Sequence, residues 1–205
     1  MTELIAVITI TILAVISPGP DFAMTSRNSL LLSRRAGIMT AVGIGMGVLV
    51  HVAYTMLGVG LLIAQSIWLF NLLKLAGAAY LIWLGISMLK SKSQSNQADA
   101  PELSLSDLAA LRTGFITNAL NPKATVFIVS LFMQVVQPTT SLLVQAGYGI
   151  FISATHIIWF VVVAIFFSAD TVRARIMKIR HWIDRIFGAL LISFGALLTM
   201  TNLSR

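Results

Sequence analysis

Six long apolar stretches account for most of this chain of 205 residues, and each approaches or exceeds the roughly 20 residues that a helix needs to cross a membrane. Hydrophobic residues make up 58% of the chain and charged residues 10%, a composition outside the range of soluble globular domains. We therefore predict an all-α integral membrane protein in which residues 1–205 form one transmembrane domain. The predicted spans are residues 4–25, 37–64, 68–89, 113–134, 142–167 and 186–201.

Basic residues between the predicted spans indicate how the chain is oriented. The net charge is +7, and most Lys and Arg residues lie in the first, third and fifth connections. Positively charged loops stay on the cytoplasmic side, so we predict that both termini face the periplasm. Because membrane topology explains the basic loops, nucleic-acid binding is not predicted. The basic residues of these connections are Arg27, Arg34, Arg35, Lys90, Lys92, Arg112, Arg173, Arg175, Lys178, Arg180 and Arg185.

A polar stretch in the middle of the chain divides the predicted spans into two sets of three. We assign residues 1–90 to the first half, 91–111 to a cytoplasmic loop and 112–205 to the second half. Because three is an odd number, related halves would be inserted with opposite orientations, a plan that recurs in secondary transporters. The sequence therefore predicts six transmembrane helices arranged as two inverted three-helix repeats.

Three weak internal matches occur in the same order in the two halves and support this repeat. Each half has a proline followed by a charged residue, then glycines followed by a histidine, then a Gly-Ala pair. We assign the glycines to close helix packing, for which membrane proteins use small residues. The matching positions are Pro20-Asp21 and Pro122-Lys123; Gly43, Gly45, Gly47 and His51 against Gly147, Gly149 and His156; and Gly77-Ala78 against Gly188-Ala189.

Prolines interrupt the first and fourth predicted helices at Pro18, Pro20 and Pro122. A proline inside a helix removes a backbone hydrogen bond and costs about 3 kcal/mol in water. Within a membrane, such a break is tolerated only where protein or a water-filled cavity satisfies the exposed backbone. One break in each half therefore predicts a single polar cavity between the halves.

A carboxylate and an ammonium group follow these breaks, at Asp21 and Lys123. Ionisable side chains within a membrane usually face the bundle interior and mark a transport pathway. If the breaks face each other, Lys123 would bind the carboxylate of a zwitterion, and Asp21 with unwound carbonyls would bind its ammonium, which predicts amino-acid substrates. Alternatively, the two charges pair with each other or cap the broken helix ends. Further candidates for substrate binding near the breaks are Ser17, Gly19, Asn118 and Asn121.

Proton coupling needs a group that changes its protonation as a carrier alternates its access. Asp21 is the best candidate, because a buried carboxylate can bind and release a proton. His51 and His156 are candidate relays, since histidine titrates near neutral pH. The alternative for each histidine is a hydrogen bond to a neighbouring helix.

Three motifs carry a resemblance to a known family. Ser17-Pro-Gly-Pro-Asp21, Asn121-Pro-Lys123 and the pattern Gly-Ala-x-Tyr-Leu-x-x-Leu-Gly from Gly77 to Gly85 resemble the LysE/RhtB family of amino-acid exporters, over the whole chain. The resemblance implies a bacterial inner-membrane protein that exports amino acids or close derivatives, driven by the proton motive force. The Ser-Pro-Gly-Pro-Asp-Phe form is most similar to threonine and homoserine or homoserine-lactone exporters. Because Asp21 is the only buried acid that we predict, we expect a small neutral substrate.

Other functions have less support in the sequence. An intramembrane enzyme would need a nucleophile with a base, paired carboxylates or a metal motif, and none of these patterns occurs. Export of metal cations or basic amino acids on the same fold is an alternative, although the three histidines and nine methionines show no ligand spacing. The chain has no cysteine, and we predict no cofactor and no bound metal. A monomer and a homo-oligomer are both compatible with the sequence, which specifies neither the coupling ion nor its stoichiometry.

Overall fold

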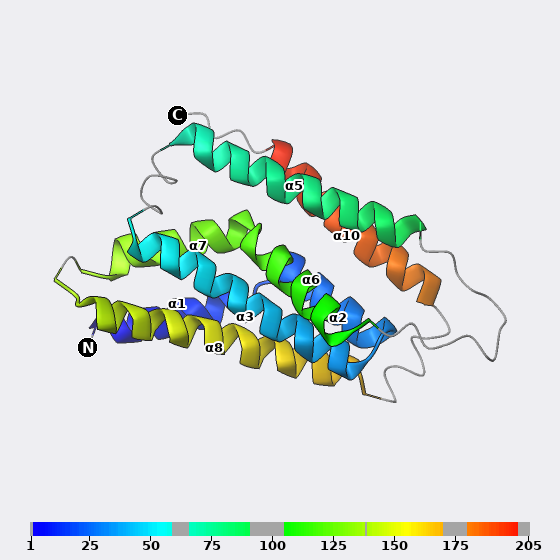
Figure 1. Cartoon of the computed structure of the whole chain (residues 1–205), viewed down its shortest axis with the longest axis horizontal. Helices are drawn as coiled ribbons and strands as arrows, with labels where there is room; N and C mark the ends of the chain where they lie inside the picture. The colour runs from blue at the N-terminus through cyan, green and yellow to red at the C-terminus, as the bar shows by residue number, and fades with distance from the viewer. Residues whose placement is uncertain (1, 59–65, 91–104, 138, 170–179, 201–205) are drawn as a thin grey trace.

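The computed structural model describes residues 2–58, 66–90, 105–137, 139–169 and 180–200, and all regular structure within them is helical. This confirms the predicted all-α class. Most of the helices lie side by side along the longest axis of the molecule (Figure 1). The eight helices of the described residues are α1 (Thr2–Ile16), α2 (Pro20–Leu31), α3 (Arg34–Met56), α5 (Ile67–Lys90), α6 (Asp107–Ala119), α7 (Pro122–Val135), α8 (Leu142–Phe167) and α10 (Arg180–Met200).

Two of the described helices, α3 and α8, are long and apolar enough to cross a membrane. Two further spans result if each helix pair joined at a break counts as one: α1 with α2, bent by 56°, and α6 with α7, bent by 59°. The expected interruption of the first and fourth spans is therefore confirmed. The apolar parts of α5 and α10, Leu75–Lys90 and Arg185–Leu197, are shorter than a span. The described residues thus contain two to four candidate spans, and six spans remain a prediction.

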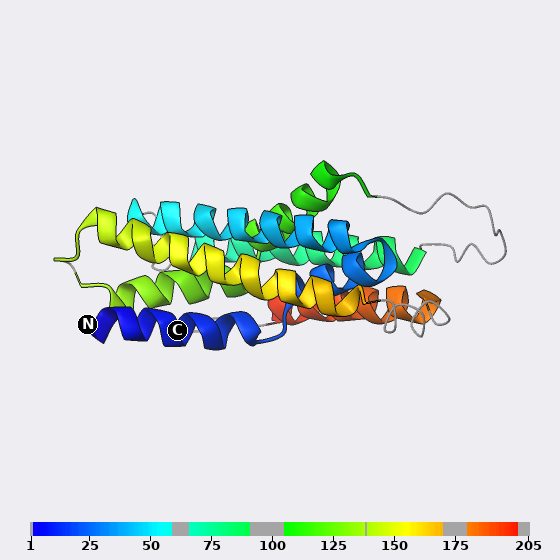
Figure 2. The same cartoon turned by 90° about the horizontal axis from the view of Figure 1, so that it is seen from below.

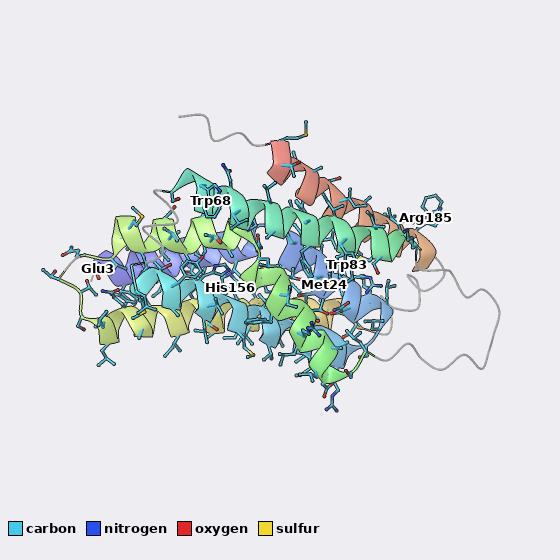
Figure 3. All side chains as sticks on the ribbon, turned by 45° about the horizontal axis from the view of Figure 1, so that its top comes forward. Glu3, Met24, Trp68, Trp83, His156 and Arg185 are labelled. Atoms are coloured by element: carbon cyan, nitrogen blue, oxygen red, sulfur yellow. The ribbon has the colours of Figure 1, made fainter. Side chains whose placement is uncertain are left out.

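The helix ends gather at two opposite ends of the molecule (Figures 1 and 2). One end, which we call the amino end, has the start of α1, the end of α3, the end of α7 and the start of α8. Glu3 lies there (Figure 3). The opposite end has the end of α2, the starts of α3 and α6 and the end of α8. The end of α5 lies there too (Figure 1). We call it the basic end, because the two turns of these helices nearest to it carry Arg27, Arg34, Arg35, Lys90 and Arg112.

The second half of the chain becomes helical earlier than we predicted. Helix α6 begins at Asp107, because Ser106 Oγ accepts a hydrogen bond from the backbone N–H of Ala109 at 3.3 Å and so caps the helix. Residues 107–111, which we assigned to the central loop, are therefore part of α6. Of the rest of that loop, residues 105 and 106 lead into α6, and residues 91–104 lie outside the described residues.

Helices α3 and α6 approach each other closely because glycines lie where they cross. A Cβ atom at Gly43 would meet the backbone carbonyl oxygen of Leu111, and a Cβ atom at Gly114 would meet that of Thr40. The packing role that we predicted for the helix glycines therefore applies at Gly43. It is wrong at Gly147, where nothing lies within 4 Å of the position that a Cβ would take.

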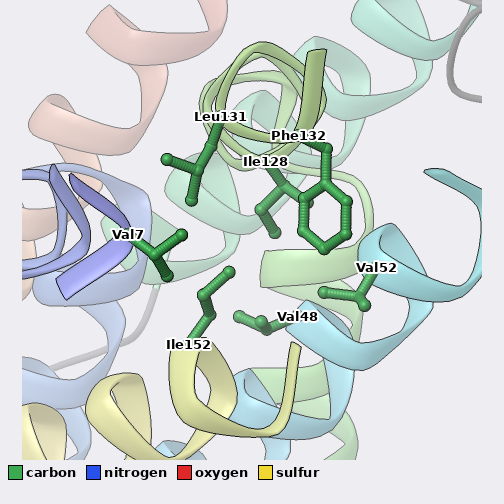
Figure 4. Close-up of a cluster of buried hydrophobic side chains, with 7 residues drawn as sticks. All are labelled: Val7, Val48, Val52, Ile128, Leu131, Phe132 and Ile152. Carbon is green, nitrogen blue, oxygen red and sulfur yellow. The ribbon is translucent and has the colours of Figure 1, made fainter. Parts of the chain in front are cut away.

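Two clusters of buried apolar side chains lie on either side of the helix breaks. Along α8, for example, Ile152 belongs to the first cluster and Phe160 to the second, and His156 lies between them. The side chains of both clusters are buried, and the clusters lie between the breaks and the two ends of the molecule. The amino-end cluster is Val7, Val48, Val52, Ile128, Leu131, Phe132 and Ile152 (Figure 4), and the basic-end cluster is Val15, Ala41, Ile44, Phe160 and Val163.

Candidate functional site

The two helix breaks are built alike. Helix α1 ends at Ile16 and α2 begins at Pro20, while α6 ends at Ala119 and α7 begins at Pro122. In each case, proline is the first residue of the second helix, where its missing N–H removes no intrahelical hydrogen bond. Each of these prolines therefore starts a new helix instead of kinking a continuous one. Pro18 lies in the non-helical link between α1 and α2.

Asp21 is buried at the start of α2, with 8% of its surface exposed. Its Oδ2 accepts hydrogen bonds from Asn118 Nδ2 at 2.9 Å and from Asn121 Nδ2 at 3.2 Å, two side chains at the end of α6 and in the link to α7. Its Oδ1 is buried and has no hydrogen-bond partner. The amino terminus of a helix favours negative charge, so the position suits a carboxylate. The unpartnered oxygen leaves Asp21 able to accept a further donor.

Lys123 reaches from the start of α7 to the link that follows α1. Its Nζ donates to the carbonyl oxygens of Ser17 at 2.8 Å and Pro18 at 3.3 Å, and to Ser17 Oγ at 3.0 Å. These bonds use all three donors of an ammonium group. They also place a positive charge at the carboxyl-terminal end of α1, where the helix dipole favours it. Lys123 therefore caps the broken end of α1.

Each charge thus binds groups at the break in the other half of the chain. Asp21 binds two asparagines of the second half, and Lys123 binds the end of α1 in the first half. Asp21 and Lys123 do not form an ion pair with each other. Among the described residues, the two oppositely charged side chains that lie within 4 Å of each other are Arg35 and Asp107. Of the alternatives that we considered, Lys123 shows the capping of a broken helix end, whereas Asp21 binds asparagine side chains at the other break.

A small cavity lies between the two breaks. Its volume of about 30 Å³ has room for roughly one or two water molecules, which is less than an amino acid needs. Binding of an amino acid would therefore require the two breaks to move apart. Charged, polar and aromatic residues all contribute to its lining. The lining residues are Ala14, Val15, Ser17, Gly19, Asp21, Phe22, Asn121, Lys123, Ala124, Phe127, His156 and Phe160.

His51 is fully buried in α3 and holds the end of α6. Its Nε2 lies 2.9 Å from the backbone oxygen of Asn118, and its Nδ1 lies 2.6 Å from Tyr54 Oη and 3.5 Å from Thr125 Oγ1. A carbonyl oxygen only accepts, so Nε2 is the donor. Both ring nitrogens have partners, which is the helix-bonding alternative that we considered for this histidine.

His156 occupies a different environment in α8, close to the middle of the molecule (Figure 3). Its Nδ1 lies 2.8 Å from the backbone oxygen of Ile152, one turn earlier in the same helix. The ring lines the cavity, and 6% of the residue's surface is exposed. His156 is therefore in reach of a molecule bound in the cavity.

The structure brings most of the residues that we identified from the sequence to one place. Asn118 does not line the cavity but donates a hydrogen bond to Asp21, and His51 in turn donates to the backbone oxygen of Asn118. The aromatic residues of the lining were not predicted, because aromatic residues within an apolar span more often pack in a core or face lipid. The predicted residues that line the cavity are Ser17, Gly19, Asp21, Asn121, Lys123 and His156, and the lining aromatic residues that we missed are Phe22, Phe127 and Phe160.

Comparison with protein families decides which class of protein has this arrangement. The model of the LysE type translocator family matches residues 12–202. The chain belongs to this family. As a LysE type translocator, it is a multi-pass membrane transporter and not an enzyme, which confirms the family that the motifs resemble.

Individual relatives of this LysE type translocator are efflux proteins. It is 34% identical over 187 residues to the threonine efflux protein of Escherichia coli strain K12, and the match covers 90% of this chain and 91% of that protein. It is 31% identical over 186 residues to the homoserine/homoserine lactone efflux protein of Salmonella typhimurium, covering 89% of each. No solved structure matched the chain.

Proposed function

We propose that this LysE type translocator exports small neutral amino acids, such as threonine or homoserine, across a bacterial inner membrane in exchange for protons. The names of its relatives support the substrate class, since they describe efflux of these compounds. The observation that carries the proposal is that two oppositely charged side chains, Asp21 and Lys123, lie at two helix breaks that share one cavity. A zwitterion is the ligand whose two charges complement this arrangement.

Substrate binding exchanges the contacts that the two charges make in the structure. The ammonium group of an amino acid has three donors, like Lys123 Nζ, so it can take over the oxygens of Ser17 and Pro18. It can also donate to Oδ1 of Asp21, which has no partner. Lys123, once released, binds the substrate carboxylate. Each charge keeps a partner throughout, and for the buried Asp21 this avoids the large penalty of an unpaired charge in a membrane.

Alternating access follows from the two apolar clusters that flank the site. The amino-end cluster joins α1, α3, α7 and α8, and the basic-end cluster joins α1, α3 and α8. Opening one cluster while the other stays closed exposes the cavity to one side of the membrane at a time. The similar bends of 56° and 59°, each with proline and a charged residue after the break, support two inverted three-helix repeats whose relative rocking opens one side.

Proton coupling is assigned to Asp21. The carboxylate binds the substrate ammonium when the cavity is loaded and a proton when the carrier returns, so the two cargoes compete for one buried group. His51 does not reach the cavity, because its Nε2 donates to the backbone of Asn118. We therefore assign a positioning role to His51.

We also propose that the basic end is cytoplasmic and that both termini are periplasmic, as the positive-inside rule predicts. Leu108 at the basic end and Leu143 at the amino end are 74% and 84% exposed, and the chain has no cysteine of its own. On intact cells, a membrane-impermeant thiol reagent should label the Leu143→Cys variant and not the Leu108→Cys variant. The opposite pattern would reverse the orientation.

Efflux from loaded cells tests the proposed function. Cells that contain the protein should lose preloaded radiolabelled threonine several-fold faster than cells without it, because export adds a route that passive leakage lacks. A protonophore should remove this difference, since it collapses the gradient that drives exchange. Efflux that persists with the protonophore would contradict proton antiport. An absence of additional efflux for every small neutral amino acid would contradict the substrate class.

Basic amino acids and metal cations fit the site less well. A second positive charge on the substrate needs a second acid, and among the lining residues Asp21 is the one acid. A metal ion needs several ligands, and within the described ranges no three His, Asp or Glu side chains lie close enough to hold one. We therefore propose a neutral amino acid as the cargo.

A further inference from the structure

We infer that His156 recognises a hydroxyl group on the side chain of the substrate and so determines which neutral amino acids are exported. This inference rests on the proposed function, because it concerns the same cavity. It assigns His156 to substrate selection instead of proton relay, and the two roles lead to different experimental results.

The hydrogen bond inside α8 fixes which nitrogen of His156 carries the proton. Nδ1 lies 2.8 Å from the carbonyl oxygen of Ile152, which can only accept, so Nδ1 is the donor. In a neutral imidazole, Nε2 is then an acceptor. Nε2 has no partner among the residues that the structure describes, and the ring lines the cavity. His156 therefore offers the cavity a hydrogen-bond acceptor in a fixed orientation.

Comparison with His51 shows why this acceptor is free. Both histidines are buried on long helices next to a helix break, but His51 uses Nε2 to hold the end of α6. The corresponding end of α1 is held by Lys123 through Ser17 and Pro18. His156 is therefore not needed as a cap, and its Nε2 remains available for a ligand.

The surroundings of His156 indicate what kind of group it accepts from. The ring centroid of Phe127 lies 6.4 Å from that of His156, and the centroid of Phe160 lies 6.3 Å from it. Phe22, Ala124 and Val15 also line the cavity and add to its apolar surface. A substrate held by Asp21 and Lys123 shares the cavity with these apolar residues and with His156, so its side chain can lie against them. A short side chain that ends in a hydroxyl buries its carbons there and donates to Nε2.

Threonine and valine have nearly the same shape, and valine has a methyl group in place of the hydroxyl. Comparing their export rates therefore isolates the effect of the hydrogen bond from the hydroxyl to His156 Nε2. A site built to bond a hydroxyl rejects the analogue that lacks it, because the buried acceptor is then unpaired. We expect the unaltered protein to export threonine about tenfold faster than valine from equally loaded vesicles, the factor that one such hydrogen bond supplies.

The His156→Leu variant should export both amino acids at similar rates, with the threonine rate reduced and the valine rate kept. The His156→Gln variant, which retains an acceptor, should recover part of the preference for threonine. The matched control is Thr155→Val, which removes a polar group from the same helix. The hydroxyl of Thr155 donates to the backbone oxygen of Phe151 within α8. This control should leave the ratio of the two rates unchanged.

Three outcomes would overturn the assignment. A ratio unchanged in His156→Leu would show that His156 does not sense the hydroxyl. Loss of export of both amino acids from His156→Leu and His156→Gln, with normal amounts of each protein in the membrane, would indicate a role in proton transfer or folding. Export of neither amino acid by the unaltered protein would overturn the proposed function and this assignment with it.

Discussion

Replacing Asp21 by asparagine is expected to reduce threonine export by at least about 100-fold. The amide has the same shape and keeps an oxygen that can accept from Asn118 and Asn121, so the break between α6 and α7 retains its contacts. It has no negative charge for the substrate ammonium and cannot carry a proton. Initial rates of efflux from preloaded cells, normalised to the amount of protein in the membrane, measure the effect.

The matched control for this substitution is Asp107→Asn. Asp107 forms an ion pair with Arg35 at the basic end, where the two side chains are 40% and 79% exposed. Exposed ion pairs contribute only about 0–1 kcal/mol, so this variant should export threonine at close to the normal rate. Normal export by Asp21→Asn would contradict the assignment of the site. Equal losses in the two variants would show that any lost acid impairs the protein, which would also contradict it.

The second large effect is expected at the crossing of α3 and α6. The Gly114→Val substitution places a Cβ against the backbone carbonyl of Thr40, and backbone atoms cannot move aside as a flexible side chain can. The two helices must separate, which we expect to destabilise the protein by about 3 kcal/mol or more. The amount of protein in the membrane and its thermal unfolding in detergent both report this loss.

Gly147→Val provides the comparison for Gly114→Val. It makes the same change within a helix, but nothing lies within 4 Å of the position of the new Cβ. The protein should accumulate normally and unfold at nearly the same temperature. If both variants were equally stable, the close approach of α3 and α6 would be contradicted. If both were equally unstable, valine itself, and not its contacts, would be the cause.

The sequence predicted the helix breaks because the residue types that mark them are local. Proline followed by a charged residue, at Pro20 and Pro122, is visible along the chain and is rare inside a membrane span. The pairing of each charge with the opposite half could not be read in the same way. Whether Lys123 meets Asp21 or the carbonyl of Ser17 depends on how two distant helices cross, and both partners were consistent with the sequence.

Other features had no local signal. Phe127 and Phe160 line the cavity, yet apolar residues in apolar spans give no periodic pattern that separates a cavity wall from a lipid-facing surface. The same reason explains the error at Gly147, which has the composition of a packing residue and faces open space. The start of α6 was misplaced because Asp107 is charged and was assigned to the loop, although Ser106 caps a helix there. Residues whose role depends on tertiary contacts were therefore predicted least well.

Cross-linking between the two breaks tests the central claim most directly. Ser17 and Lys123 are 106 positions apart, and their side chains are in contact in the structure. With a protease site inserted within residues 91–104, a chain carrying Ser17→Cys and Lys123→Cys can be treated with a short bifunctional thiol reagent and then cut. We expect the two fragments to remain joined, because the two side chains are in contact in the structure. The control chain carries Met133→Cys, on the exposed side of α7, in place of Lys123→Cys, and its fragments should come apart. If the fragments of the Ser17→Cys, Lys123→Cys chain also came apart, the convergence of the two breaks on one site would be contradicted.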